Sequence, residues 1–185
     1  MKVVAIITSR WESTRLPGKA LVDICGEPML QRIVDTAGQS AWVDEVVIAT
    51  TPSSQPIIDY CKENNISHYI GDEEDILGRL YETAKQFNAN LIVRLWGDAP
   101  LVETYQIDSA IKYARLLEPT DYTSLSSNNG VVAVMSFALL KSANTELTDK
   151  ESRLWFHKYL DNQKLTVDTK EDLDGVCKVW VMSKR

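Results

Sequence analysis

The stretch Val3-Val4-Ala5-Ile6-Ile7-Thr8 decides the fold class of this chain. It is a continuous apolar run rich in β-branched residues, which is typical of a strand buried on both faces of a parallel sheet. A second short run of this kind covers Glu45–Thr50, and apolar residues at helical spacing fill Met29–Ser40 between them. The order strand, helix, strand predicts a βαβ unit and therefore an α/β fold.

The same alternation continues along the middle of the chain. The patterns predict strands at His68–Ile70 and Leu91–Leu95, with helices at Gln55–Asn64, Asp75–Phe87 and Tyr105–Leu117. Such a series predicts a three-layer α/β/α domain with a Rossmann-like, mostly parallel sheet.

The last third of the chain has a less regular pattern. It contains no internal repeat, low-complexity tract or linker, so we expect residues 1–185 to form one domain. The elements expected there are strands at Tyr122–Leu125, Val131–Met135 and Leu165–Val167, and helices at Phe137–Ala143, Lys150–Asp161 and from Lys170 onward.

Composition narrows the possible functions. With 20 basic and 26 acidic side chains the net charge is −6, which argues against non-specific attraction to nucleic acid or anionic lipid. No apolar run approaches the roughly 20 residues that a membrane span needs, and no signal-peptide pattern opens the sequence, so we expect a cytoplasmic protein. Three cysteines without a Cys-x-x-Cys pair and two histidines exclude the common zinc motifs. Carboxylates, arginines and lysines are left to carry any chemistry.

The loop Ser9–Lys19 is the first candidate site. It follows the first predicted strand, at the carboxyl edge of the sheet where open α/β folds bind ligands. It is neither a Walker loop nor a dinucleotide fingerprint. Even so, the forked N–H donors of its arginines and the compact charge of its lysine suit phosphate oxygens. The alternative is a solvated surface loop with incidental charge. Its cations and hydroxyls are Arg10, Arg15, Lys19, Ser13 and Thr14, against one acid, Glu12.

Two carboxylates are the next candidates. Asp98 follows the strand Leu91–Leu95 on a turn bounded by Gly97 and Pro100, and Asp168 follows the short strand Leu165–Val167. Mg²⁺ prefers few protein carboxylates and takes substrate phosphates and water as its other ligands. Two carboxylates facing the cationic loop therefore predict a magnesium-triphosphate cradle. The alternatives are a turn aspartate that bonds its own backbone and a helix cap, respectively.

Three motifs occur in a fixed order along the chain. They are Ser-Arg-x-x-Ser-Thr-Arg-Leu-Pro-Gly-Lys at 9–19, Arg-x-x-Gly-Asp-x-Pro-Leu at 94–101 and Val-Asp-Thr-x-Glu-Asp-Leu at 167–173. Together they resemble the cytidylyltransferases that activate acidic sugars, a family that includes 3-deoxy-manno-octulosonate and acylneuraminate cytidylyltransferases. The segments 26–30, 47–51 and 74–79 are most similar to its spore-coat polysaccharide branch.

The resemblance implies a single nucleotidyltransferase domain with the nucleotide-diphospho-sugar transferase fold. It implies Mg²⁺-dependent transfer of CMP from CTP to a sugar acid with release of pyrophosphate, in surface polysaccharide or glycoconjugate precursor synthesis. The implied partners are CTP and a small sugar-acid acceptor, and a homodimer is an open possibility. The implied catalytic residues are Arg10, Lys19 and Asp98, the metal ligands Asp98 and Asp168, and the nucleotide-binding residues Thr8, Ser9, Arg10, Ser13, Arg15, Lys19, Arg79 and Gly97.

Four departures from the family pattern leave alternatives open. Trp11 and Trp96 stand where relatives carry other residues, and each is expected either to stack on a base or substrate ring or to pack in the core. Ala133 replaces an acid, and the acceptor and dimerisation region at about 124–165 is short. The alternatives are a phosphonate or sugar-phosphate acceptor, with Lys141 and Arg153 as candidate cations, and a degenerate relative that binds nucleotide without catalysis.

Overall fold

Six strands form one mixed sheet in the computed structural model of the chain, which describes residues 1–13, 16–116, 122–127 and 130–156. Their spatial order is β3-β2-β1-β4-β6-β5. The first four in this order are parallel, whereas β6 runs antiparallel to β4 and β5 antiparallel to β6. The strands are β1 (Val3–Thr8), β2 (Glu45–Thr50), β3 (Ser67–Ile70), β4 (Leu91–Trp96), β5 (Tyr122–Ser127) and β6 (Gly130–Ser136).

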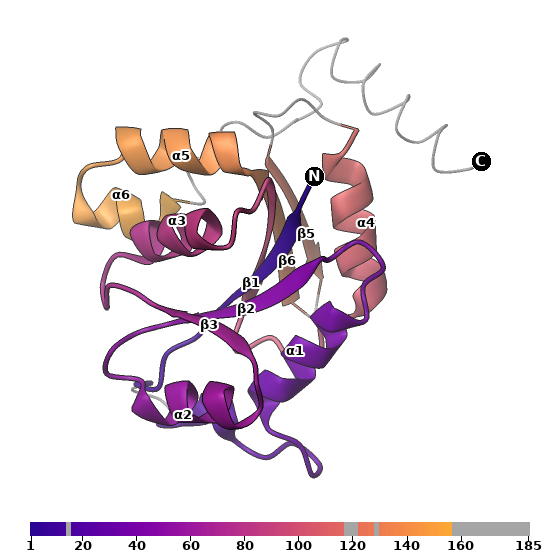
Figure 1. The fold of residues 1–185 in the computed structure, drawn as a ribbon, viewed down its shortest axis with the longest axis vertical. Helices are drawn as coiled ribbons and strands as arrows, with labels where there is room; N and C mark the ends of the chain where they lie inside the picture. The colour runs from indigo at the N-terminus through magenta and orange to yellow at the C-terminus, as the bar shows by residue number, and fades with distance from the viewer. Residues whose placement is uncertain (14–15, 117–121, 128–129, 157–185) are drawn as a thin grey trace.

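Helices cover both faces of this sheet, which confirms the predicted three-layer α/β/α architecture (Figure 1). One face carries α1 (Met29–Gly38), α2 (Gln55–Glu63) and α4 (Thr104–Ala114). The opposite face carries α3 (Ile76–Gln86) and α5 (Phe137–Glu146), and the short α6 (Lys150–Leu154) lies against α3. A single 3₁₀ turn, η1 (Lys19–Leu21), lies beside α1 within the described residues.

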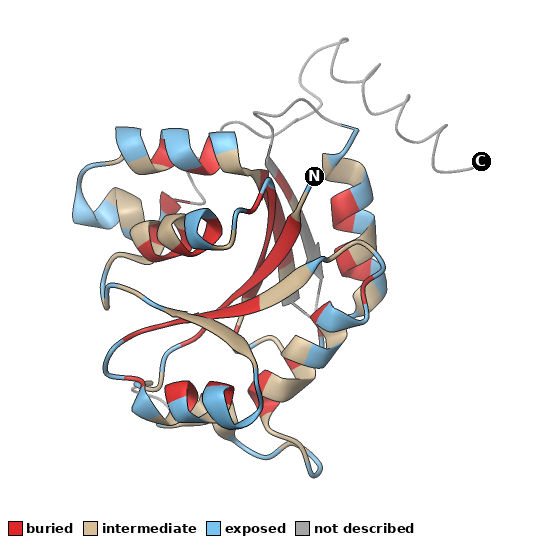
Figure 2. Cartoon of the chain, in the orientation of Figure 1, coloured by how far each residue is buried: buried red, intermediate tan, exposed pale blue. Residues whose placement is uncertain are grey.

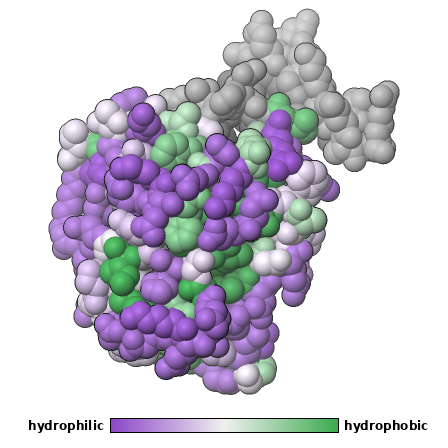
Figure 3. Space-filling view, in the orientation of Figure 1, coloured by the Kyte–Doolittle hydropathy of each residue, from purple (hydrophilic) through white to green (hydrophobic). Residues whose placement is uncertain are grey.

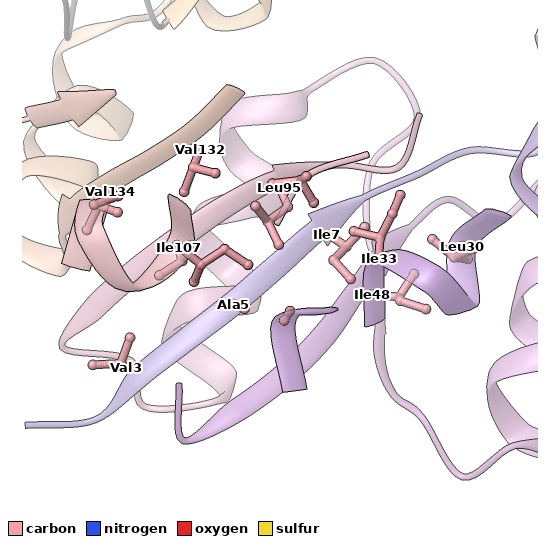
Figure 4. Packing of buried hydrophobic residues seen from close by; sticks show 14 of the residues in the cluster. Val3, Ala5, Ile7, Leu30, Ile33, Ile48, Leu95, Ile107, Val132 and Val134 are labelled. Carbon is pink, nitrogen blue, oxygen red and sulfur yellow. The ribbon is translucent and has the colours of Figure 1, made fainter. Parts of the chain in front are cut away.

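The burial of β1 explains why its sequence is apolar throughout. Successive side chains of a strand point to opposite faces, so a strand covered on both sides needs no polar positions. Val3, Ala5 and Ile7 pack toward α1 and α4, whereas Val4 and Ile6 pack toward α3 and α5. All five are fully buried, as the red strands of Figure 2 show, and Figure 4 shows the α1 and α4 side of this packing.

The predicted elements that lie within the described residues match the observed ones to within a few residues. The helix expected over Lys150–Asp161 begins as predicted: α6 covers Lys150–Leu154 and the chain turns at Trp155, whereas residues 157–161 lie outside the described part of the chain. The turn lets Phe156 enter the core, where it is fully buried against the α3 and α5 face. The predicted strand Leu165–Val167 and the helix from Lys170 lie outside the described residues.

Polar side chains dominate the surface seen in Figure 3, with smaller apolar areas between them. In the part of the chain that the structure describes, no helix combines the length and apolar character needed to cross a bilayer.

Candidate active site

The carboxyl ends of β1 and β4 meet so closely that only glycine fits between them. Gly97 donates its N–H to the Thr8 carbonyl oxygen at 3.0 Å. A Cβ atom on Gly97 would lie 2.7 Å from Ser9 Cβ and 2.9 Å from that same oxygen. Three of the predicted nucleotide-binding residues, Thr8, Ser9 and Gly97, are therefore contiguous at the sheet edge.

Lys19 and Asp98 form an ion pair although they lie 79 residues apart in the sequence. The Lys19 Nζ is 2.6 Å from the Asp98 Oδ2. Lys19 opens η1, and Gly18 before it has a φ of 70°, a left-handed conformation that favours glycine. The end of the cationic loop and the turn after β4 thus converge, as the sequence predicts. Arg15 and Asp168 lie outside the described residues, so their convergence on this edge stays a prediction.

Arg79 brings a buried guanidinium to the same edge from α3. Its side chain is only 4% exposed, and its Nη1 donates to the Asp72 carbonyl oxygen at 2.7 Å. The Nε is buried and has no hydrogen-bond partner. The apolar stem packs on Gly71, where a Cβ atom would lie 2.8 Å from Arg79 Cγ. A largely buried guanidinium has lost most of its water, so a ligand oxygen that reaches its remaining exposed surface gains more than it would at an open surface.

The charges around Arg79 show which groups share its surroundings. Burial lowers the pKa of Arg79, the nearby carboxylate of Glu73 raises it, and the cation of Arg10 lowers it further. Arg10 is exposed and follows Ser9 at the start of the loop. The guanidinium groups of Arg10, in the loop after β1, and of Arg79, in α3, therefore lie in the same part of the edge, as the assignment of both to nucleotide binding requires.

The structure gives each of the two unusual tryptophans an intramolecular contact. The Trp11 ring lies over Gly18, where a Cβ atom would be 2.8 Å from its Cη2. The Trp96 ring centroid is 4.4 Å from the guanidinium carbon of Arg94. Packing within the protein is thus the alternative that this structure supports for both rings.

Position 133, where alanine replaces the acid of the family pattern, lies opposite the buried cation of Arg94. Arg94 has its guanidinium buried between two aromatic rings, with the Phe156 centroid 4.7 Å from its central carbon. Ala133 is its direct partner across β4 and β6. Aromatic faces attract a cation by their quadrupole, so the two rings stabilise this charge.

Several other predicted residues have roles inside the protein. The Ser13 hydroxyl accepts the Leu16 N–H at 3.3 Å and so shapes the loop. Arg153, a candidate cation for an acceptor phosphate, binds the Asp75 carboxylate at 2.6 Å and the Leu147 carbonyl oxygen at 2.7 Å. It ties α6 to the start of α3. Lys141 is exposed on α5.

The sequence reasoning missed a group of polar residues beside Arg10 and Arg79. Thr51, Ser53 and Ser54 follow β2, and the Ser53 hydroxyl donates to both carboxylate oxygens of Glu73 at 2.8 and 2.9 Å. Three hydroxyl residues within four positions of a strand end were the available signal, because the carboxyl ends of all parallel strands share one edge.

The described residues contain no group of three or more His, Cys, Asp or Glu side chains placed to hold a metal ion. Asp98 is a single carboxylate, with its side chain 49% exposed at the edge beside the cationic loop. This arrangement fits Mg²⁺, which is bound through one or two carboxylates together with phosphate oxygens and water.

The mostly parallel sheet and its edge of cations, hydroxyls and one carboxylate define an α/β protein of the nucleotidyltransferase class. The sequence model of the cytidylyltransferase family matches residues 4–175. The chain therefore belongs to the cytidylyltransferase family.

The proteins similar in sequence include named members of the sugar-acid branch that the motifs indicate. The chain is 39% identical over 113 residues to a 3-deoxy-manno-octulosonate cytidylyltransferase of Geobacter sulfurreducens, covering 60% of this chain and 44% of the relative. It is 28% identical over 159 residues to an uncharacterised protein of Methanocaldococcus jannaschii, covering 83% and 64%. The chain thus spans less than half the length of the named relative.

Solved structures share the fold at low identity. A cytidylyltransferase from Leptospira borgpetersenii superposes with a TM-score of 0.80 at 23% identity, covering 94% of this chain and 84% of that one. A CMP:2-keto-3-deoxy-manno-octonic acid synthetase complexed with CTP superposes with a TM-score of 0.69 at 19% identity, covering 99% and 100%. These matches confirm the predicted nucleotidyltransferase fold.

Proposed function

We propose that this chain is a Mg²⁺-dependent cytidylyltransferase that transfers CMP from CTP to a sugar acid and releases pyrophosphate. The contact between Lys19 and Asp98 carries the proposal, because it joins the cationic loop to a carboxylate at the ligand-binding edge of the sheet. Family membership and the similarity to named 3-deoxy-manno-octulosonate cytidylyltransferases support the choice of reaction.

The nucleotide is assigned to the cations of this edge. Arg10 and Lys19 bind triphosphate oxygens, with Arg15 as a further predicted contact, and the largely buried guanidinium of Arg79 binds the nucleotide. Thr8, Ser9 and Gly97 provide a closely packed floor. Because phosphoryl transfer depends mainly on positioning and charge neutralisation, this set of residues is sufficient in kind for the reaction.

The reaction itself is a substitution at the α-phosphorus of CTP. An acceptor hydroxyl oxygen forms a bond to that phosphorus, the bond to the bridging oxygen of the β-phosphate breaks, and the hydroxyl proton passes to solvent. Negative charge grows on the departing pyrophosphate. Arg10 and Lys19 stabilise that charge, which makes them catalytic as well as binding residues.

Asp98 is the proposed Mg²⁺ ligand, and Asp168 is the predicted second one, outside the described residues. Bound Mg²⁺ neutralises charge on phosphate oxygens and orients them. In this structure Asp98 is paired with Lys19. Binding of the nucleotide gives Lys19 a phosphate partner and frees the Asp98 carboxylate to bind Mg²⁺.

The acceptor and the setting of the reaction are further parts of this proposal. A sugar acid is supported by the named relatives, and precursor synthesis for surface polysaccharide or glycoconjugates in the cytoplasm follows from that choice. A single domain over residues 1–185 and a homodimer remain predictions. A phosphonate or sugar-phosphate acceptor has less support, because Arg153 already binds Asp75.

Pyrophosphate release tests the function directly. We expect release with CTP, Mg²⁺ and at least one member of a sugar-acid panel, and much less with UTP, GTP or ATP. Calorimetric titration with CTP separates the failures. CTP binding without pyrophosphate release across sugar acids, sugar phosphates and phosphonates would support the degenerate, nucleotide-binding alternative. Folded protein that does not bind CTP would contradict the proposal as a whole.

A further inference from the structure

Trp11 closes the cationic loop on itself. Its half-buried ring covers the Cα of Gly18, where a Cβ atom would lie 2.8 Å from Cη2 and 3.0 Å from Cζ2. The backbone reinforces this contact, because the Gly18 N–H donates to the Trp11 carbonyl oxygen at 3.3 Å. Arg10 directly precedes Trp11 and Lys19 directly follows Gly18. One contact therefore fixes the backbone beside both cations.

A buried serine holds Trp11 in turn. The backbone N–H of Trp11 donates to the Ser54 Oγ at 2.8 Å, and that Oγ is 2.7 Å from the Thr51 Oγ1. Both hydroxyl residues are fully buried. Ser54 precedes α2 at the position where a serine ordinarily accepts a helix N–H, yet it makes no such bond. Its hydroxyl serves the loop rather than the helix.

The same hydroxyls lead to the surroundings of Arg79. The Thr51 Oγ1 is 3.2 Å from the Ser53 Oγ, and Ser53 donates to Glu73, whose carboxylate raises the pKa of Arg79. The start of the cationic loop and the loop before α3 are thus connected by hydrogen bonds through the turn after β2.

We propose that Trp11 is a positioning residue, which holds the loop in its nucleotide-binding shape and is itself held by the buried Thr51 and Ser54 hydroxyls. The inference rests on the proposed function, in which Arg10 and Lys19 bind the triphosphate. The cations of the loop repel one another, and a loop that is not anchored loses conformational entropy when it binds the nucleotide. A loop ordered in advance avoids that loss, so the anchor raises affinity without touching the nucleotide.

Two substitutions test the anchor from its two sides. Ser54→Ala removes the acceptor of the Trp11 N–H without removing a helix cap, and Trp11→Phe shortens the ring that covers Gly18. We expect each to raise the Kd for CTP with Mg²⁺ by about tenfold, the equivalent of one lost hydrogen bond. We also expect KM for CTP to rise while kcat at saturation stays within twofold, because the bound nucleotide restores the shape of the loop.

Fluorescence provides a readout that general destabilisation does not change. The contribution of Trp11 to the fluorescence is obtained by subtracting the emission spectrum of a protein that carries Trp11→Phe from that of the same protein with Trp11. We expect Ser54→Ala to increase the quenching of this emission by acrylamide before the protein unfolds. Two matched controls are Ser136→Ala, which removes a true cap from α5, and Trp42→Phe, whose ring lies under Arg115. Both are expected to leave CTP affinity within twofold of the native protein.

The outcomes separate this inference from the proposed function. If the native protein binds CTP and both loop variants bind it within twofold of the native value, Trp11 does not position the loop. If Ser54→Ala does not fold, Trp11→Phe decides alone, because its ring is only half-buried. A native protein that fails to bind CTP contradicts the proposed function instead. Strong quenching of Trp11 by CTP itself would identify a ring that stacks on the base and would overturn the inference.

Discussion

The exposed pair, Lys19 and Asp98, and the buried guanidinium of Arg79 place charge at the same sheet edge in opposite ways. The side chains of the pair are 27% and 49% exposed, and each neutralises the other. Arg79 is 4% exposed, makes a hydrogen bond to a carbonyl oxygen and keeps an unfilled Nε donor. One group is easily rearranged, and the other is held in place.

The two arrangements suit different roles. The exposed pair can exchange its partners when a ligand binds, whereas the buried guanidinium recognises the ligand. An exposed ion pair contributes little to stability, so its partners can be replaced by phosphate and metal at low cost. A buried guanidinium has lost most of its water, so a ligand acceptor that reaches it gains more than it would at the surface. The comparison predicts that variants of the pair change turnover and salt response, whereas variants of Arg79 change affinity.

Asp98→Asn gives the largest expected effect. The amide has nearly the same shape but carries no charge to hold a divalent cation. We expect pyrophosphate release to fall by about 10²- to 10³-fold. The free energy of unfolding should change by less than about 1 kcal/mol, because the pair is exposed. Steady-state turnover and thermal unfolding measure the two quantities. Native turnover in the variant would remove Asp98 from the metal site.

Arg79→Met tests the buried side of the comparison. The new side chain keeps an apolar stem over Gly71 but loses every donor. We expect the Kd for CTP to rise by about 10- to 100-fold, which corresponds to one hydrogen bond to a charged group. Isothermal titration measures it. Arg115→Met, at the far end of α4 beside Trp42, is the matched control and should leave CTP affinity unchanged. Equal affinities for all three proteins would remove Arg79 from the nucleotide site.

Gly97→Ala disturbs the floor between the two charged groups. A Cβ atom there would meet the Thr8 carbonyl oxygen at 2.9 Å, and backbone of a central strand cannot easily move. We expect a loss of about 1–3 kcal/mol in the free energy of unfolding. Weaker CTP binding should accompany this loss. Both are measured by urea unfolding and titration.

Gly38 is the control for this substitution. It ends α1, and a Cβ atom on it would have no neighbour within 4 Å. We expect Gly38→Ala to raise the free energy of unfolding by about 0.4–1 kcal/mol, because it restricts the unfolded chain. If both alanine variants behave alike, the close approach of β1 and β4 is not what position 97 requires.

Lys19→Met has the smallest expected effect in the absence of nucleotide. Removing an exposed partner should change the free energy of unfolding by less than about 1 kcal/mol, and the change should shrink in high salt. Urea unfolding at low and high ionic strength measures both. A loss of several kcal/mol that is independent of salt would show that the pair is a structural element and not an exchangeable one.

Much of the fold follows from local patterns in the sequence. The run at 3–8, the run at 45–50 and the helical spacing between them each reflect how a strand or helix buries its side chains. The loops expected to bind ligand also follow, because parallel strands place their carboxyl ends at one edge. For this reason Thr8, Lys19 and Asp98 belong to one candidate site before any coordinates are considered.

The end of α6 and the contacts of the tryptophans could not be predicted in the same way. Helical periodicity continues past Leu154, whereas the chain turns at Trp155 and buries Phe156 against Arg94. Whether Trp11 faces a ligand or Gly18 depends on the path of a loop, which has no periodic pattern. Local sequence does not report such paths.

The amino-acid sequence by itself determined the α/β class and the edge at which ligand-binding loops gather, since both depend on short-range periodicity and on strand direction. The tertiary structure alone decided that Lys19 meets Asp98, that Ser54 turns its hydroxyl to Trp11 and that Ser53 binds Glu73. Each of these contacts joins separate elements, so it depends on strand order and loop path, which are set by the packing of the whole chain.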